Sequence, residues 1–150
     1  MQRHAGMVTA TGWLLAMSLV GHSLGAHAAG FCERMPMDPE FPAGLNGSYD
    51  IVGRDVRTGH AYTGTLALDH GREVYTLART VQGRTVHGEA WMESCGVDRI
   101  RTLVVRYDAE PVIRMACSLG ADGGNYYRVS CRTVQGGNDS PGLEAWYQRP

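Results

Sequence analysis

The sequence predicts an all-β fold of about eight antiparallel strands, arranged as two four-stranded meanders that form a small lipocalin- or avidin-like barrel or a sandwich. Three observations lead to this fold class. Short segments rich in Val, Thr and Tyr alternate apolar and polar residues with a period of two. Clusters of Gly, Asp and Asn separate these segments. The pentapeptide RTVQG occurs twice, at residues 79–83 and 132–136, which indicates a duplicated unit.

Residues 1–28 have the three parts of a secretory signal. Arg3 and His4 are basic, Met7–Val20 is mainly apolar, and Ala26 and Ala28 are the small residues that precede a cleavage site. A permanent membrane anchor is the alternative, but glycines interrupt the apolar stretch before it reaches the roughly 18–20 residues of a membrane span. We therefore expect cleavage after Ala28 and a periplasmic or secreted chain without a membrane anchor.

The exported part divides into an N-terminal arm and one domain. The arm, residues 29–46, contains Pro36, Pro39 and Pro42, which we expect to prevent regular structure. The domain covers residues 47–150. Alternation predicts strands at residues 47–53, 61–68, 73–81, 84–93, 100–108, 112–119, 126–134 and 142–147. The predicted turns include residues 69–71, 82–83 and 122–125.

The repeat also predicts two ion pairs. In each half an Arg precedes the turn and a Glu follows it, as Arg79 with Glu89 and Arg132 with Glu144. If each pair faces across its hairpin, it contributes roughly 0.2–1 kcal/mol to the stability of the fold.

The sequence holds four cysteines, all beyond the signal, and an even number in an exported chain indicates two disulfides. Three pairings are possible. Cys117 and Cys131 lie symmetrically about the predicted turn at Gly124, so we expect them to be joined. That leaves Cys32 to Cys95, which would attach the arm to the domain.

The segments GSYDIVG at residues 47–53 and GHAYTGTL at residues 59–66, with YTL at residues 75–77, resemble a known pattern. The pattern is that of small secreted bacterial proteins, some described as fibronectin-binding proteins and many as domains of unknown function. The resemblance covers roughly Leu45–Trp91 and, loosely, Gly142–Tyr147. It departs at Arg79, where those proteins often carry a Trp. It implies a secreted β-barrel-like domain with a binding role, and it carries over no catalytic residue.

The sequence shows no catalytic or metal-binding pattern. No Ser lies in a G-x-S-x-G motif, and His60, His70 and His87 are too widely spaced for a local metal motif. Glu89 and Glu93 share a strand face, as a glycosidase pair could, but fit surface carboxylates equally well. We expect no enzyme activity, no cofactor and no metal. The formal net charge of −1 also lacks the basic excess that nucleic acid binding requires.

The two tryptophans of the domain, Trp91 and Trp146, occupy matching places in the repeat. They belong either to the core, as is usual in a small domain, or to an exposed aromatic platform. In the second case Trp91, Trp146, Tyr126 and Tyr127 are the predicted binding residues. We expect an exported binding protein whose partner is a protein of the envelope or extracellular space. A small-ligand carrier with its ligand inside the barrel, or an envelope structural or stress protein, remains as an alternative.

Overall fold

The computed structural model describes residues 31–38, 40, 42, 44–55, 58–121, 126–134 and 142–150. The expected signal peptide, the predicted turn at residues 122–125 and the end of the second RTVQG copy lie outside the described residues. Nine strands are seen in the described part of the chain. They are β1 (Cys32–Arg34), β2 (Gly47–Arg54), β3 (Ala61–His70), β4 (Tyr75–Val81), β5 (Arg84–Cys95), β6 (Ile100–Tyr107), β7 (Ile113–Ala121), β8 (Tyr127–Thr133) and β9 (Leu143–Gln148).

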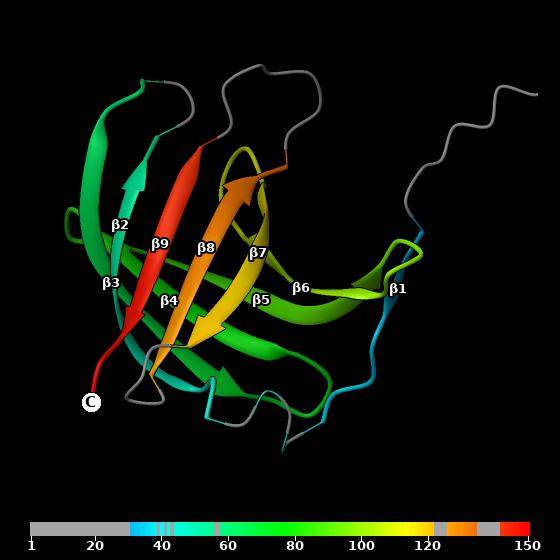
Figure 1. Cartoon of the computed structure of the whole chain (residues 1–150). Helices are drawn as coiled ribbons and strands as arrows, with labels where there is room; N and C mark the ends of the chain where they lie inside the picture. Colours follow the sequence, from blue (N-terminus) through cyan, green and yellow to red (C-terminus); the bar gives the residue numbers. More distant parts are fainter. Residues whose placement is uncertain are drawn as a thin grey trace, which may run out of the picture.

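Strands β2 to β9 form a closed antiparallel barrel (Figure 1). Each strand pairs with the next along the chain, and the first barrel strand, β2, pairs with the last, β9. The β5–β6 pairing completes the circle, from Gly88 opposite Tyr107 to Cys95 opposite Ile100. The predicted all-β class with eight barrel strands is therefore confirmed, and of the two architectures the barrel is the one formed.

Alternation along each strand places one set of side chains inside the barrel. Tyr49 and Ile51 of β2, Leu66 and Leu68 of β3, and Trp146 of β9 are all buried in this way. The remaining large core residues are Leu45, Tyr75, Leu77, Met92, Leu103, Val105, Tyr107, Met115 and Val129, with both members of one disulfide, Cys117 and Cys131. Burial of so many apolar side chains supplies the main driving force for folding.

Two glycines have defined backbone roles, one in the barrel wall and one in a turn. A Cβ on Gly88 would lie 2.3 Å from the backbone oxygen of Arg106 on β6, so only glycine allows β5 to approach so closely. Gln82 and Gly83 form the two-residue turn between β4 and β5, both with positive φ, as a type I′ hairpin requires. The predicted turn at these two residues is confirmed.

The N-terminal arm is partly ordered as a strand, contrary to the expectation that its prolines prevent regular structure. β1 precedes the first of these prolines and pairs with the end of β5, from Cys32 opposite Cys95 to Arg34 opposite Glu93. Farther along, Met35, Met37 and Leu45 pack against the core. The arm therefore follows the barrel wall and contributes side chains to its interior.

Both expected disulfides are formed. Cys117 and Cys131 face each other on β7 and β8, and Cys32 and Cys95 join β1 to β5. Two disulfides within one chain are consistent with an oxidising, extracytoplasmic location.

The two RTVQG copies do not occupy equivalent positions in the barrel. The repeat aligns Leu77 with Ser130, yet Leu77 is buried and Ser130 is exposed. The cause is the register: β3 and β4 place Leu68 opposite Leu77, whereas β7 and β8 place Cys117 opposite Cys131. The sequence similarity thus does not extend to which face each residue occupies.

Candidate functional site: a polar network at one end of the barrel

A buried carboxylate lies at the end of the barrel where β9 begins. The side chain of Glu144 is 0 % exposed. Its Oε2 accepts hydrogen bonds from the Tyr62 hydroxyl at 2.7 Å and from Arg79 Nε at 2.8 Å. Its Oε1 accepts from Trp146 Nε1 at 2.7 Å and from the Tyr107 hydroxyl at 3.3 Å. Four donors therefore replace the water that the carboxylate loses on burial.

The Arg79 guanidinium is held by charge and by aromatic rings. It forms the ion pair with Glu144 and is 15 % exposed. Its Cζ lies 4.9 Å from the centroid of the Tyr62 ring and 5.4 Å from that of Tyr107, both within cation–π range. Burial, the largest single effect, lowers the pKa of Arg79, but the charge and hydrogen bond of Glu144 together with Tyr62 and Tyr107 outweigh it, so the pKa is raised. The guanidinium therefore stays charged and fixed in position.

The two tyrosines stay protonated for the same reasons. Burial, and then the nearby charge of Glu144, raises the pKa of both Tyr62 and Tyr107 above the ordinary tyrosine value. Each neutral hydroxyl can therefore donate to the carboxylate across the physiological pH range.

Backbone geometry places these side chains. Gly53 lies directly opposite Tyr62, and a Cβ on Gly53 would come within 2.2 Å of the Tyr62 ring. The missing side chain at Gly53 therefore provides the space for the ring. Glu144 and Trp146 are two residues apart on β9, so both point into the barrel.

The network borders two cavities. The inner one, of about 100 Å³, is lined by Tyr62, Tyr107 and Glu144 together with Arg54, Asp55, Arg79, Ile113, Met115 and Thr133. The outer one, of about 280 Å³, is the mouth groove, lined by Asp55, Arg79, Val81, Gln82, Arg84, Val86, Ala109, Glu110, Pro111 and Ile113. Arg79 lines both cavities and is therefore accessible from the mouth of the barrel.

The predicted ion pairs within the repeat are wrong, although two of their members form an ion pair with each other. Arg79 points inward and lies opposite Val86, whereas Glu89 is exposed on the outer face. Arg132 is exposed and lies opposite Leu143, whereas Glu144 is buried. In each predicted pair the two side chains lie on opposite faces of the wall. Arg79 and Glu144, from different halves, meet across the barrel interior instead.

The four predicted binding residues do not form one exposed surface. Trp146 is a core residue with its ring edge-on to Tyr49 at 5.9 Å, so it cannot be part of a platform. Tyr127 is partly buried against the core, and Tyr126 is exposed.

Trp91 is partly buried on the outer face of β5. The guanidinium carbons of Arg34 and Arg114 lie 5.0 and 5.7 Å from its ring centroid. Its Nε1 donates to Glu93 at 2.7 Å. Trp91 is therefore occupied by neighbours of its own chain.

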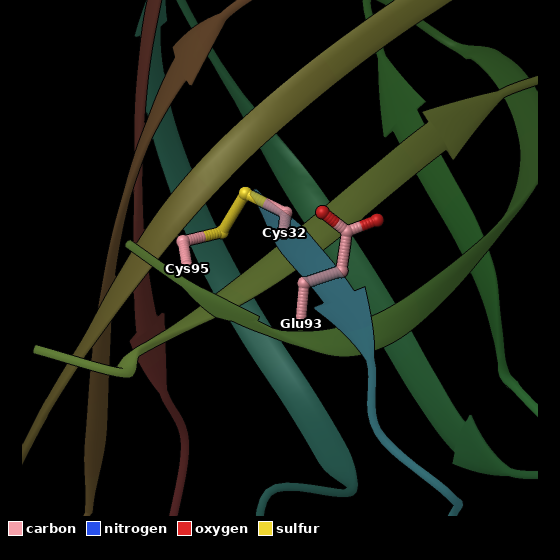
Figure 2. A group of neighbouring side chains, drawn as sticks. All are labelled: Cys32, Glu93 and Cys95. Carbon is pink, nitrogen blue, oxygen red and sulfur yellow. A yellow bond between two sulfur atoms is a disulfide. The ribbon is translucent and has the colours of Figure 1, made fainter. Parts of the chain in front are cut away.

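One group of possible metal ligands occurs among the described residues. Cys32, Cys95 and Glu93 place their ligand atoms within 4.8 Å of one another. Figure 2 shows these three side chains, with the disulfide that joins the two cysteines. The two sulfurs are bonded to each other, so neither is a thiolate able to bind a metal. In the disulfide form the group offers a single carboxylate.

Comparisons with known proteins give likenesses of fold only. No family model matches the sequence, and no curated protein matches it. A redesigned β-barrel superimposes with a TM-score of 0.47 at 14 % identity, covering 71 % of this chain and 91 % of that one. A de novo designed fluorescence-activating β-barrel gives 0.46 at 15 % identity, covering 71 % and 94 %. In the part of the chain that the structure describes, no helix is long and apolar enough to cross a membrane.

Proposed function

We propose that the chain is an exported, non-catalytic binding protein, periplasmic or secreted, that engages a protein partner at the mouth groove. The observation that supports this role is the Arg79 guanidinium, which is fixed by Glu144 and two tyrosine rings and borders the groove. The signal-like residues 1–28 and the two disulfides support export.

A buried ion pair is a poor source of stability, because apolar residues of similar size would often serve the fold equally well. The Arg79–Glu144 pair lies beside a groove rather than in the middle of the core. A side chain held in one conformation loses little entropy on binding, and arginine is well suited to two-pronged recognition of a carboxylate. The arrangement therefore favours a binding role for Arg79.

The rest of the groove fits a protein side chain. Val81, Val86 and Pro111 provide an apolar wall, and Arg84 and Glu110 provide charges around it. A central anchor surrounded by polar residues is the usual form of a protein-binding hot spot. The partner residue that fits has an apolar stem and a carboxylate end directed at Arg79.

The alternative of a carrier with its ligand inside the barrel has less support. The inner cavity of about 100 Å³ is well below the roughly 300–1,000 Å³ of small-molecule sites. A carrier would have to hold its ligand in one of the cavities outside the barrel interior instead.

Site-specific photo-crosslinking in the native host tests this proposal. p-Benzoylphenylalanine replaces Arg84, which lines the groove, and in a control it replaces Thr65, which is exposed on β3. We expect an adduct with one defined protein from position 84 and none from position 65. No adduct from position 84, or equal adducts from both, would overturn the proposal.

A double variant, Arg79→Met with Glu144→Met, tests the role of the guanidinium. It removes both charges together, so no unpaired charge remains buried. The Tyr62, Tyr107 and Trp146 donors lose their acceptor, so circular dichroism first establishes that the variant is folded. We expect the adduct from position 84 to fall at least about tenfold, as loss of a hot-spot arginine implies. An unchanged adduct in a folded double variant would exclude Arg79 as the anchor.

A further inference from the structure

The outer face of the barrel wall carries a row of small side chains that runs across neighbouring strands. β3, β2, β9, β8 and β7 lie side by side in this part of the wall (Figure 1). Because strands alternate their faces, the register sets one outward residue of each strand beside an outward residue of the next. With about 4.8 Å between neighbouring strands, the row spans roughly 19 Å. We call this row the outer band, and in order around the wall it consists of Ser118, Ser130, Ala145, Val52 and Thr63.

Two cavities lie along the outer band. One, of about 340 Å³, has Ser118 and Ser130 in its lining. The other, of about 480 Å³, has Val52 and Thr63 in its lining. Ala145 is the register neighbour of both Ser130 and Val52, so a single methyl group separates the two halves of the band. A side chain this small forms no ridge, and the two cavities therefore continue into one elongated surface.

The next row of outward residues supplies charge and apolar surface. In this row Leu143 lies between Arg132 of β8 and Arg54 of β2. Leu143 is 53 % exposed and Val52 is 47 % exposed, which is unusual for neighbouring apolar side chains. The Nε atom of Arg54 donates to the carbonyl of Gly59 at 3.0 Å, which restricts where its guanidinium lies. Among the described residues that line the two cavities, none is acidic.

The charges beside the outer band favour an anionic partner. The formal net charge of the chain is −1, so two arginines flanking one leucine are a local concentration of positive charge. Asp50, an acidic residue on the same face of β2, is neutralised by its ion pair with Arg149. A two-fold contact between copies of this face would bring Arg54 and Arg132 against their own equivalents, and like charges disfavour such a contact. Two arginines also match widely spaced charges better than the dense phosphates of nucleic acid.

The backbone beneath the outer band is already paired. β8, β9 and β2 each have a hydrogen-bonded strand on both sides, so their N–H and C=O groups are occupied. An extended peptide would lose the main-chain hydrogen bonds on which strand addition depends. Recognition here must come from side chains, and the hydroxyls of Ser130 and Thr63 can each donate and accept. Such a surface suits a ligand that itself carries many hydroxyl groups.

We propose that the outer band binds a polysaccharide that contains uronic acids. The sugar chain lies across the strands, and its carboxylates pair with Arg132 and Arg54 in two-pronged contacts. Its hydroxyls form hydrogen bonds with Ser130 and Thr63. The apolar faces of its rings cover Leu143, whose exposed side chain lies between the two arginines.

The outer band is separate from the mouth groove. The groove, as the structure describes it, is lined by none of the band residues and by neither Arg132 nor Leu143. The protein partner proposed for the groove and the polysaccharide proposed for the band are therefore tested by different residues. Failure of either proposal leaves the other untouched.

The test uses the ¹⁵N-labelled chain purified after export, with hexamers of galacturonate, of mannuronate and of hyaluronan. Each acidic hexamer has a control hexamer whose carboxyl groups are methyl esters. We expect at least one acidic hexamer to shift the amide signals of Ser130, Ala145 and Val52. Its methyl ester should bind at least about tenfold more weakly, because it keeps the hydroxyls and ring faces but loses the charge.

Two partly buried alanines on the outer face provide matched variants. Ala145→Phe fills the middle of the outer band, and Ala78→Phe places the same ring on β4, outside the band. Circular dichroism first establishes that both variants are folded. We expect Ala145→Phe to weaken binding of the acidic hexamer at least about tenfold by obstructing it, and Ala78→Phe to leave binding unchanged.

Two exposed arginines test the charge. Arg132→Ala removes a charge beside the outer band, and Arg106→Ala removes one from β6, away from the band. We expect Arg132→Ala to weaken binding of the acidic hexamer about threefold or more and Arg106→Ala to leave it unchanged.

Several outcomes would overturn the proposal. Absence of binding by all three acidic hexamers, equal binding of a methyl ester, or unchanged binding by folded Ala145→Phe would each exclude it. Tighter binding of a polyglutamate peptide than of any hexamer, with the same amide signals shifted, would assign the outer band to an acidic protein segment. Binding of anionic vesicles without binding of any hexamer would assign it to a membrane surface.

Discussion

Glu144 joins the two halves of the chain through its contacts with Tyr62, Arg79, Tyr107 and Trp146. Replacing Glu144 by Gln keeps the size of the side chain but leaves Arg79 without its counter-charge. We expect Glu144→Gln to lower the free energy of unfolding by about 3 kcal/mol, at the low end for a broken buried pair because Arg79 keeps some exposure. Urea unfolding followed by circular dichroism measures this loss.

Glu89→Gln is the control, because the repeat relates Glu89 to Glu144 while its side chain is exposed. It should change the free energy of unfolding by no more than about 0.5 kcal/mol. Equal effects of the two substitutions would contradict the assignment of Glu144 as the buried member.

The buried tyrosines predict a stability that depends on alkaline pH. Burial raises the pKa of Tyr49, Tyr62, Tyr75 and Tyr107 above the ordinary value of about 10. Above that pH the unfolded chain releases tyrosine protons that the folded chain retains, so stability is complete below pH 10 and falls as the pH rises. Urea unfolding at pH 8, 9, 10 and 11 should show this decline. A free energy of unfolding that stays constant from pH 9 to pH 11 would argue against these shifts.

Gly88 permits the close contact between β5 and β6 that closes the barrel. Gly88→Ala would bring a methyl group against the backbone oxygen of Arg106, which cannot move without shifting β6. We expect a loss of about 1–3 kcal/mol in the free energy of unfolding, as for other overpacked sites. Gly120→Ala is the matched control, because its Cβ would meet Arg128 at an ordinary 3.5 Å. Similar losses in both variants would mean that general strand effects, rather than the close approach, determine the cost.

Most of the strands could be predicted from the sequence, because a strand with one buried face alternates apolar and polar residues. β6 shows this, since Leu103, Val105 and Tyr107 are all buried as the alternation requires. The Cys117–Cys131 pairing followed from a hairpin's symmetry, which is also a local property. β1 was missed because three residues are too few to show a period.

The polar network could not be predicted, because it depends on which side chains meet across the barrel. Arg79 and Glu144 lie 65 residues apart in sequence and are brought together only when the circle closes. The repeat predicted the wrong partners. A difference in register turns residues of β4 and the aligned residues of β8 to opposite faces of the barrel wall. The Glu-x-Trp spacing gave no local signal, because Glu89, two residues before Trp91, is exposed, whereas Glu144, two residues before Trp146, is buried.

The arm and its disulfide connect the N-terminal end of the described chain to the barrel wall. The double variant Cys32→Ser with Cys95→Ser removes a crosslink that spans 63 residues, which restricts the unfolded chain strongly. We expect it to lower the free energy of unfolding by about 2–4 kcal/mol while the barrel still unfolds in one cooperative transition. Guanidinium unfolding followed by circular dichroism measures both. Two separate transitions in the variant would show instead that the disulfide couples two independent units.

The pairing of β2 with β9 has a consequence for how a newly made chain acquires its structure. A chain that emerges N-terminus first produces β2 early but must wait for Leu143–Gln148 before the partner of β2 exists. Until then the β2 edge can pair with other chains, and the carboxylate that neutralises Arg79 has not yet been made. Contacts so distant along the chain also make folding slow. The nascent protein therefore gains from being kept unfolded until β9 has been synthesised, and closure of the barrel is a late event in its folding.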